Sequence, residues 1–409
     1  MGQIWFVSLV MALMSSVVPR LVAQDLPPGA RVEIKPSDLP PPYATPSVRN
    51  RAAPLTRREG QVPRVPDGFS ITPFADGLQH ARWLAVAPNG DVLLAEPRAG
   101  HVRILRDADG DGRAETSEIF AAGLQRPHGM VLHGDALYVA DTEGVWRLPY
   151  KTGSLRAGGK AEAVTAPGAL GPGSGHWTRN LAIAPDGTKL YVAIGSASNI
   201  AEESSPRATI QEFNLDGSGQ RTFAAGLRNP VGIAFYPGTH DLYTVVNERD
   251  GLGDELVPDY LTKVRDGGFY GWPYAYIGGH PQPGLAARRP DLVKQTLAPD
   301  LLFRAHTAAL GLVFYTADMF PAAMKGDAFV GLHGSWNAAT PRGYHVVRVP
   351  FKGGRPVGHY EVFMSGFWVE GEQPARVIGR PVGLAVAKDG SLLVADDAAN
   401  VVWRVSYRR

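Results

Sequence analysis

One stretch of the chain, residues 226–273, concentrates side chains that bind charged ligands. Arg228 and Asn229 stand directly before a run of alternating apolar residues, and a second apolar run follows a Pro-Gly turn. Guanidinium and amide groups bind anions, whereas carboxylates and backbone carbonyls bind hard cations such as calcium. The stretch therefore predicts a ligand or cation site; an ordinary hairpin with a solvated acidic loop is the alternative. The loop after the second run holds Glu248, Asp250, Asp254 and Glu255.

A second acidic loop, residues 107–118, reads DADGDGRAETSE. It satisfies the calcium-loop pattern D-x-D-x-D-G-x5-E, in which Asp107, Asp109, Asp111 and Glu118 supply oxygen ligands and Gly112 makes the turn. Its flanks alternate like strands, so the loop does not belong to an EF-hand. It predicts a calcium site that stabilises the fold, with an ordinary Asp-Gly hairpin as the alternative.

His176 lies in the segment GSGHWTRN. A neutral imidazole has a reference pKa near ~6.5, so it can accept a proton at neutral pH as a general base. The alternative is a structural histidine packed beside Trp177.

These residues need elements that bring them together, and an internal repeat supplies them. Six segments each contain an alternating apolar run, a turn such as Pro-Asn-Gly or Pro-Asp-Gly, and a second apolar run. This strand–turn–strand pattern at intervals of 46 to 79 residues is typical of a propeller. The sequence therefore predicts an all-β, six-bladed β-propeller over residues 67–409. The six segments are residues 82–96, 128–141, 179–195, 231–246, 310–332 and 382–396.

Basic and amide side chains recur directly before the first strand of the predicted blades. In a propeller these positions surround one mouth of the central channel. A ring of cations is costly unless an anion sits among them, so the pattern predicts an anionic ligand shared by the blades. The alternative for each residue is a hydrogen bond within its own blade. The ring consists of His80, Arg82, Arg126, His128, His176, Arg179, Arg228, Asn229, Arg304, His306 and Arg380.

Composition excludes several classes of function. Net charge is +2 and no basic run contains interleaved aromatic residues, so nucleic-acid binding is not expected. The chain has no cysteine, which excludes disulfides, iron–sulfur clusters and c-type haem. Forty-eight glycines and 34 prolines suit a fold with many tight turns. Any redox chemistry therefore requires a non-covalent cofactor.

The N-terminus predicts export. Residues 1–23 have an apolar run that is short for a membrane span and end in Leu-Val-Ala, which is a plausible signal-peptide cleavage site. We expect a periplasmic or secreted protein with no membrane span after cleavage; an uncleaved anchor is the alternative. Residues 24–66 form a Pro-rich extension without apolar periodicity, which we expect to be extended and partly disordered.

The motifs GHWTRNLAIAPDG, GLRNPVG, VNERDGLGDELVPDY, DGGFYGWPYAYIG and GRPVGLAVAKDGSLLVADD resemble the quinoprotein sugar dehydrogenases of the glucose/sorbosone dehydrogenase family. The likeness extends over residues 67–409 and is strongest to the branch similar to L-sorbosone dehydrogenase. It implies a six-bladed propeller that uses pyrroloquinoline quinone (PQQ) and calcium. The implied reaction is oxidation of an aldose or a sorbosone-like aldehyde, with electrons passed to a separate acceptor.

The resemblance also implies roles for individual residues. His176 matches the general base, and Arg228, Asn229 and Arg380 match groups that contact the cofactor. Arg228 would also stabilise charge that develops during the reaction. Because of its place in the ring, we add His128 to the predicted cofactor contacts. The calcium would be held by the backbone carbonyls of Arg249 and Asp250, with Asp254 and Glu255 nearby.

The chain departs from the family pattern at three places. Ser196 stands where glucose-oxidising members have an Asp beside the base, Val382 replaces a second arginine, and no clear equivalent of a cofactor-contacting lysine is found. Without the carboxylate, the acid limb of the pH–rate profile is expected nearer the reference pKa of histidine than in relatives that have the Asp. Two other functions are considered: a calcium-dependent lactonase, and a binding propeller without catalysis. A neutral lactone does not need the cationic ring, whereas the missing Asp and Lys partners favour a binding protein.

Overall fold

The computed structural model describes residues 25–408, and within them the fold is almost entirely β-structure. The predicted signal peptide, with Gln24, and Arg409 lie outside the described residues. No helix of the described part is long and apolar enough to cross a membrane. The helical segments are short: α1 (Pro290–Gln295), η1 (Pro36–Asp38), η2 (Ala286–Arg288) and η3 (Ala322–Met324).

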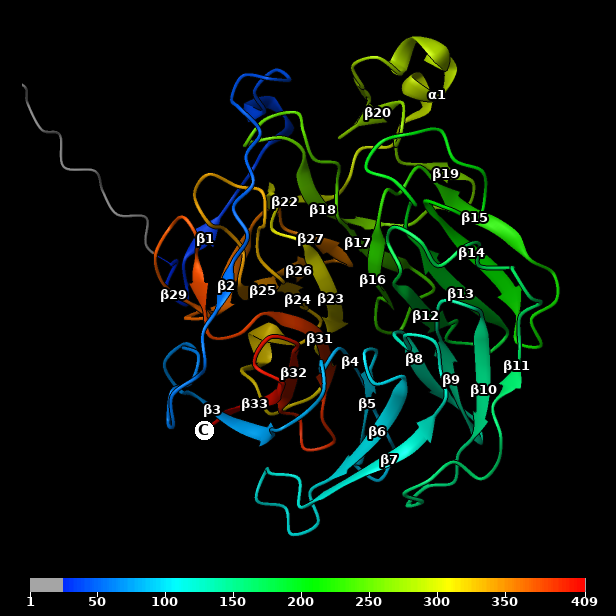
Figure 1. Ribbon diagram of the computed structural model, residues 1–409, viewed down its shortest axis with the longest axis vertical. Helices are drawn as coiled ribbons and strands as arrows, with labels where there is room; N and C mark the ends of the chain where they lie inside the picture. The colour runs from blue at the N-terminus through cyan, green and yellow to red at the C-terminus, as the bar shows by residue number, and fades with distance from the viewer. Residues whose placement is uncertain (1–24, 409) are drawn as a thin grey trace, which may run out of the picture.

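Six sheets of four or five strands make up most of the described chain. Each contains strands from one of the predicted repeats, and Figure 1 shows the sheets arranged around a common centre. The first three in chain order are β4 (Trp83–Val86), β5 (Val92–Glu96), β6 (His101–Arg106) and β7 (Thr116–Ala122); β8 (Met130–His133), β9 (Ala136–Ala140), β10 (Val145–Pro149) and β11 (Glu162–Ala163); and β12 (Arg179–Ile183), β13 (Lys189–Ile194), β14 (Thr209–Asn214) and β15 (Arg221–Ala225), with β19 (Gly268–Phe269) at its edge.

The last of the six sheets joins the two ends of the described chain. Its outer strand is β3, from the N-terminal side, which pairs with the C-terminal strand β33. The other three sheets are β16 (Pro230–Phe235), β17 (Leu242–Val246), β18 (Pro258–Lys263) and β22 (Leu301–Ala305); β23 (Ala309–Phe314), β24 (Ala328–Leu332), β25 (His345–Val349) and β28 (Tyr360–Met364), with β1 (Arg31–Val32) at its edge; and β31 (Pro381–Val386), β32 (Leu392–Asp396), β33 (Val401–Tyr407) and β3 (Phe69–Ala75).

Smaller sheets of two or three strands lie outside the six main sheets. One of them lies along the N-terminal extension, and the others belong to excursions between the main strands. They are β2 (Ala53–Pro54) with β30 (Arg376–Val377) and β29 (Trp368–Glu370), β20 (Ala275–Tyr276) with β21 (His280–Pro281), and β26 (Phe351–Lys352) with β27 (Arg355–Pro356).

The first strands of the six sheets lie next to one another around the centre. Contacts run from β4 through β8, β12, β16, β23 and β31 and back to β4. Glycines permit the close approach: a Cβ at Gly232 would lie 2.6 Å from the carbonyl oxygen of Leu310, and one at Gly383 would lie 2.5 Å from that of Arg82. The Gly that recurs in the repeat motif is therefore required where neighbouring inner strands touch.

The hairpin turns follow from the sequence of each repeat. In the Pro-Asp-Gly turn between β12 and β13, Asp186 Oδ1 accepts a hydrogen bond from the Thr188 N–H at 3.0 Å, and Gly187 has φ +71°. Asp389 accepts from the Ser391 N–H at 2.9 Å in the same way, and Gly390 has φ +92°. An acid followed by glycine thus closes the turn, because only glycine adopts positive φ without strain.

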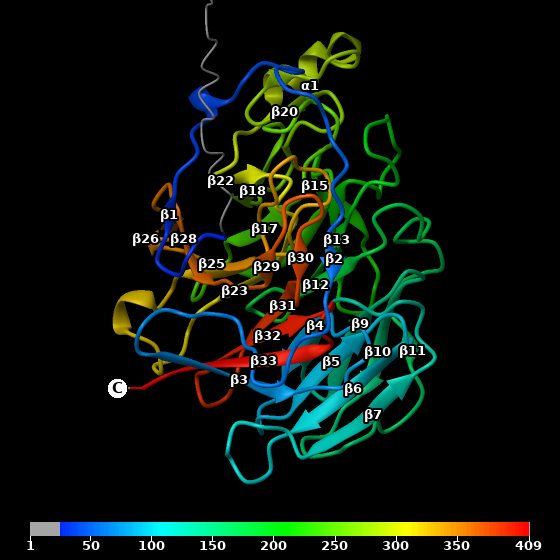
Figure 2. The same ribbon diagram turned by 60° about the vertical axis from the view of Figure 1, so that its left-hand side comes forward.

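The N-terminal extension packs along the sheets, with β1 at the edge of β28 and β2 beside β30 (Figure 2). Asn50 is buried and donates to the carbonyls of Ala338, at 3.0 Å, and Glu372, at 2.7 Å. Backbone and side-chain hydrogen bonds to the sheets hold residues 25–66, together with apolar contacts of Ile34, Leu39, Ala52 and Val65 with the core.

Candidate functional site

Arg228 joins two loops at the inner ends of neighbouring sheets. It stands two residues before β16 and is buried. Its guanidinium donates to the backbone oxygen of Glu248 at 2.8 Å, to the backbone oxygen of Asn199 at 3.0 Å and to Asn199 Oδ1 at 2.9 Å. These bonds tie the loop after β13 to the loop after β17. The N–H groups of Arg228 therefore donate mainly to acceptors within the protein. Its Nη2 also lies 3.7 Å from Asp250 Oδ2.

Ser196, two residues after the end of β13, orients the ring of His176. The ring Nδ1 lies 2.8 Å from the Ser196 carbonyl oxygen and 3.0 Å from Ser196 Oγ. Ser196 Oγ donates to the Ser198 carbonyl at 2.6 Å, so both of these oxygens accept from Nδ1–H. The neutral imidazole then carries its proton on Nδ1 and leaves Nε2 as the basic atom.

The local electrostatics keep that imidazole neutral. Burial and the neighbouring Arg228 guanidinium lower the pKa of His176 to about 3. This pKa lies far below the reference value for histidine, because desolvation and the Arg228 guanidinium lower it in addition to the absence of a neighbouring carboxylate at Ser196. Asn229 lies on the other side of Gly195, where a Cβ would lie 2.7 Å from His176 Cβ and would overlap Asn229 Oδ1. Glycine at 195 thus allows His176 and Asn229 to approach each other.

Asp250, in the loop between β17 and β18, is the acid of that loop whose charge acts on His176. Its Oδ1 accepts from Asn337 Nδ2 at 2.6 Å and lies 3.7 Å from His306 Nδ1. Its backbone oxygen already accepts from Asn199 Nδ2 and from the Arg249 side chain, each at 2.9 Å. The carbonyl predicted to bind calcium is thus engaged, whereas the carboxylate is partly exposed.

Asp254 and Glu255 pair with a guanidinium. Arg342 Nη2 lies 2.7 Å from Asp254 Oδ2 and 3.0 Å from Glu255 Oε1, and the Ala339 N–H donates to Asp254 Oδ1 at 2.7 Å. These contacts fix the loop against the segment after β24. Asp254 and Glu255, which were predicted to lie near a bound calcium, thus have Arg342 as their partner in the structure.

A cavity of about 600 Å³ is lined by residues that lie next to strands of five of the six sheets: Arg82 before β4, Arg126 before β8, Trp177 before β12, His333 after β24 and Arg380 before β31. Asp397 on its wall binds Arg82 Nη1 at 2.5 Å and His333 Nε2 at 2.8 Å. Arg380, predicted as a cofactor contact, also lines it and donates to the His333 carbonyl at 3.0 Å. Burial and Arg380 lower the pKa of His333 to about 4. The other lining residues include His80 and Arg98.

His128 does not line this cavity. It is fully buried, its ring lies 4.8 Å from that of Trp83 and 5.7 Å from that of Trp177, and neither ring nitrogen has a hydrogen-bond partner within the described chain. Burial, with nearby Arg82, lowers its pKa well below the ordinary value. The predicted cofactor contact is thus corrected to a neutral core histidine between two indoles.

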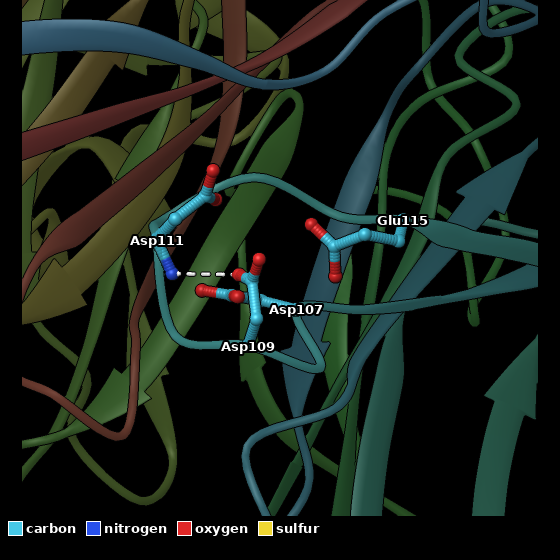
Figure 3. Close-up of side chains that lie close together, drawn as sticks. All are labelled: Asp107, Asp109, Asp111 and Glu115. Carbon is cyan, nitrogen blue, oxygen red and sulfur yellow. Dashed lines mark hydrogen bonds between the residues drawn. The ribbon is translucent and has the colours of Figure 1, made fainter.

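The outer acidic loop forms a cluster with a different membership from the one predicted. Asp107, Asp109, Asp111 and Glu115 place carboxylate oxygens within 4.8 Å of one another (Figure 3). Glu118 lies outside this cluster, in β7, 3.8 Å from Arg156. The pattern failed at its twelfth position because strand β7 begins at Thr116, so Glu115, the last residue of the loop, turns inward instead.

Two residues that the sequence reasoning did not single out organise the site. Asn199 forms hydrogen bonds with both Arg228 and Asp250. Asp397 contacts Arg82 and His333 in the cavity. The repeat carried a signal for the neighbouring Asp396 and not for Asp397, because an acid stands at the end of the second strand in several units. Asp396 and Asp141 accept backbone hydrogen bonds from their own blade openings, at Arg380 and Gln125 respectively. Asn199 had no such signal.

The chain belongs to the TrAA12-like family, whose model matches residues 63–260 and 291–408. An uncharacterized protein of Borreliella burgdorferi is 26% identical over 357 residues, which cover 85% of this chain and 91% of that protein. A pyrroloquinoline quinone-dependent pyranose dehydrogenase of Coprinopsis cinerea is 26% identical over 412 residues, which cover 83% of this chain. The match covers 54% of that dehydrogenase, so this chain spans about half of its length.

Solved structures show the fold. The holo form of the pyranose dehydrogenase PQQ domain from Coprinopsis cinerea superposes with a TM-score of 0.72 at 21% identity, covering 87% of this chain and 99% of that one. The PQQ-bound aldose sugar dehydrogenase of Streptomyces coelicolor has a TM-score of 0.60 at 17% identity, covering 84% and 100%. The fold of this nearly all-β chain is thus that of these dehydrogenases.

Proposed function

We propose that this protein is a quinoprotein oxidoreductase that oxidises a pyranose, another aldose or a sorbosone-like sugar aldehyde with PQQ and calcium. The six sheets would be the blades of a closed six-bladed propeller. The observation that carries the proposal is His176, whose Nδ1 is fixed by Ser196 and whose Nε2 is thereby the basic atom. Its setting in a TrAA12-like chain, beside Asn229 and Arg228, supports a role in sugar oxidation.

The residues present fit PQQ. A tricarboxylate needs cations, and Arg82, Arg126 and Arg380 line a cavity whose volume is within the usual range of ~300–1,000 Å³ for small-molecule sites. Trp177, next to the base in sequence, lines the same cavity. Asn229 Oδ1 is buried and has no hydrogen-bond partner among residues 25–408, so it is an acceptor available to a ligand.

A calcium ion would be held by Asp250. Its carboxylate is partly exposed, and Arg228 is 3.7 Å from its Oδ2. Arg249 could add its carbonyl oxygen, whereas Asp254 and Glu255 would act from a distance through the loop that Arg342 fixes. Oxygen ligands of this kind are those that calcium prefers.

The roles of the chain's own groups follow from their geometry. His176 Nε2 accepts the proton of the substrate hydroxyl, while the Ser196 oxygens hold the ring and fix its tautomer. Arg228 places positive charge beside the reacting atoms, and Trp177 excludes water from one side. PQQ, when bound, supplies the two-electron acceptor for the hydride that leaves the sugar carbon. A separate acceptor would then take the electrons, and the predicted location is periplasmic or secreted.

The test is reconstitution. Purified protein is mixed with PQQ, calcium, both or neither, and reduction of a redox dye is followed with a panel of pyranoses, other aldoses, sugar aldehydes and lactones. We expect dye reduction only with PQQ and calcium together and only with sugars or aldehydes. Equal activity without PQQ would overturn the proposal, and hydrolysis of lactones would favour the lactonase. Tight binding of a sugar without turnover would favour a binding protein.

A further inference from the structure

The loop that carries His176 rests on two buried arginines from neighbouring strands. Arg179 begins β12 and is fully buried. Its guanidinium donates to the His176 carbonyl at 3.0 Å and to the Pro172 carbonyl at 3.0 Å. It also donates to the carbonyls of Thr178, at 3.1 Å, and Leu170, at 3.3 Å.

Arg207, two residues before β14, holds the same loop from the other side. It donates to the Pro172 carbonyl at 2.6 Å and to the Ser174 carbonyl at 2.8 Å, and a longer bond of 3.4 Å reaches the His176 carbonyl. The two guanidiniums thus share two carbonyl acceptors. Together they bind five carbonyls of a loop that has no regular secondary structure around His176.

No carboxylate forms an ion pair with Arg179 or Arg207 within residues 25–408; the charge of Glu203 acts on Arg207 only from beyond ion-pair distance. The Nε atoms of both arginines are buried without a hydrogen-bond partner there. Burial and the neighbouring Arg207 lower the pKa of Arg179 to about 9. Burying two like charges side by side without an anion is unfavourable for folding. Stability alone therefore gives no reason for the arrangement.

We propose that Arg179 and Arg207 are positioning residues for the base: they hold the backbone of the His176 loop and keep positive charge next to an imidazole that must stay neutral. This inference rests on the proposed role of His176 as the general base. Charge-assisted bonds to carbonyls are stronger than neutral ones, so they restrain the loop more tightly. The charged groups that face His176 are Arg228, Arg207 and Asp250, of which the two arginines disfavour the imidazolium and Asp250 favours it.

The test uses variants of Arg207, because its side chain is slightly more solvent-exposed than that of Arg179, together with a matched control. Arg207→Gln removes the charge, and Arg207→Lys keeps the charge but loses the forked donors. The control is Arg221→Gln on β15, because Arg221 is partly exposed and pairs with Glu212 at 2.7 Å and Asp266 at 2.6 Å, away from the loop. The pKa of His176 is measured by NMR in the protein without PQQ, and kcat and KM are measured after reconstitution.

In Arg207→Gln we expect a higher His176 pKa and a kcat reduced by about 10- to 100-fold, since small misplacements of a catalytic group have effects of this size. KM should change little. Arg207→Lys should keep the low pKa but lose part of kcat. If the pKa and kcat of Arg207→Gln match those of Arg221→Gln, the proposal is wrong. If Arg207→Gln does not fold, a kcat for Arg207→Lys equal to the unaltered protein's overturns the positioning role.

The NMR measurement separates this inference from the proposed function. If the reconstituted protein oxidises no sugar but the His176 pKa rises in Arg207→Gln alone, then the electrostatic part of the inference holds and the assigned reaction fails. If the protein oxidises sugars and the His176 pKa is unchanged in Arg207→Gln, the reaction stands and the inference fails.

Discussion

The two acidic loops of this chain look alike in sequence and differ in structure. In the outer loop, Asp109 and Asp111 are exposed, and their carboxylates accept only local backbone N–H groups. In the inner loop, Asp254 is bound to Arg342 at 2.7 Å, and Asp250 accepts from Asn337 at 2.6 Å. The outer loop gathers carboxylates close together, whereas the inner loop distributes them among cations and amides.

This difference shows what an acidic motif can do in each setting. Clustered carboxylates without cationic partners repel one another, and a divalent cation relieves that repulsion. Carboxylates that already have guanidinium partners fix the backbone instead. We therefore expect the outer loop to bind calcium for stability, and the inner loop to fix the backbone around Asp250.

The largest effect is expected at His176. In His176→Gln the side chain keeps its approximate size but loses the basic nitrogen, so kcat should fall by ~10²–10⁴-fold. Steady-state dye reduction measures the loss, and PQQ binding should be retained. Calcium-dependent stabilisation by the outer loop should be unchanged, which serves as the control. Full turnover in this variant would show that another group takes the proton.

A smaller effect is expected where the inner loop is fixed. Arg342→Met removes the partner of Asp254, whose side chain is only 13% exposed, and leaves a largely buried carboxylate without a cation. The free energy of unfolding should fall by about 3 kcal/mol, as measured by urea denaturation.

The double variant Asp254→Asn with Arg342→Met should recover part of that loss, because the unpaired charge is gone. Additive effects of the two substitutions would mean that this ion pair does not fix the loop.

The outer loop offers the complementary test. Calcium at about one hundred times its dissociation constant should stabilise the protein by about 2.7 kcal/mol, raising the melting temperature. Asp109→Ala and Asp111→Ala should abolish this rise and leave turnover intact, whereas Asp254→Asn should leave the rise in place. A Glu115→Gln variant should weaken the effect more than Glu118→Gln, since Glu115 belongs to the cluster. Equal melting curves with and without calcium would identify a plain hairpin.

The smallest shift is expected in the pH–rate profile. The imidazole must be neutral to accept a proton, so the rate falls only below the pKa of His176, which burial and Arg228 lower to about 3. Activity should therefore hold between about pH 7 and pH 5, where an ordinary histidine base would already lose it. Ser196→Asp should move the acid limb to higher pH by about one unit, because an anion favours the imidazolium. A limb near pH 6.5 in the unaltered protein would show that His176 is more exposed in solution than in this structure.

Much of the fold could be predicted because it is encoded locally. Alternating apolar residues and the Asn-Gly or Asp-Gly turns specify hairpins such as β12–β13, where Asp186 and Gly187 supply the turn contacts. The pairing of β3 with β33 joins segments at opposite ends of the chain, and no local pattern specifies it. The ordered path of residues 25–66 could not be predicted, since it depends on carbonyls of distant loops that receive Asn50.

The candidate site also combines features that could be predicted from the sequence with features that could not. The repeat places His176, Arg228 and Asn229 directly before the first strands of neighbouring sheets, and this placement can be read from the residues alone. The positions of His128 between two indoles, of Glu115 in place of Glu118 and of Arg342 beside Asp254 and Glu255 depend on how distant segments pack. The physical reason is that charge partners and desolvation arise from segments far apart in the chain. Asp254 and Arg342 are 88 residues apart, and spacing within one motif carries no information about such a pair.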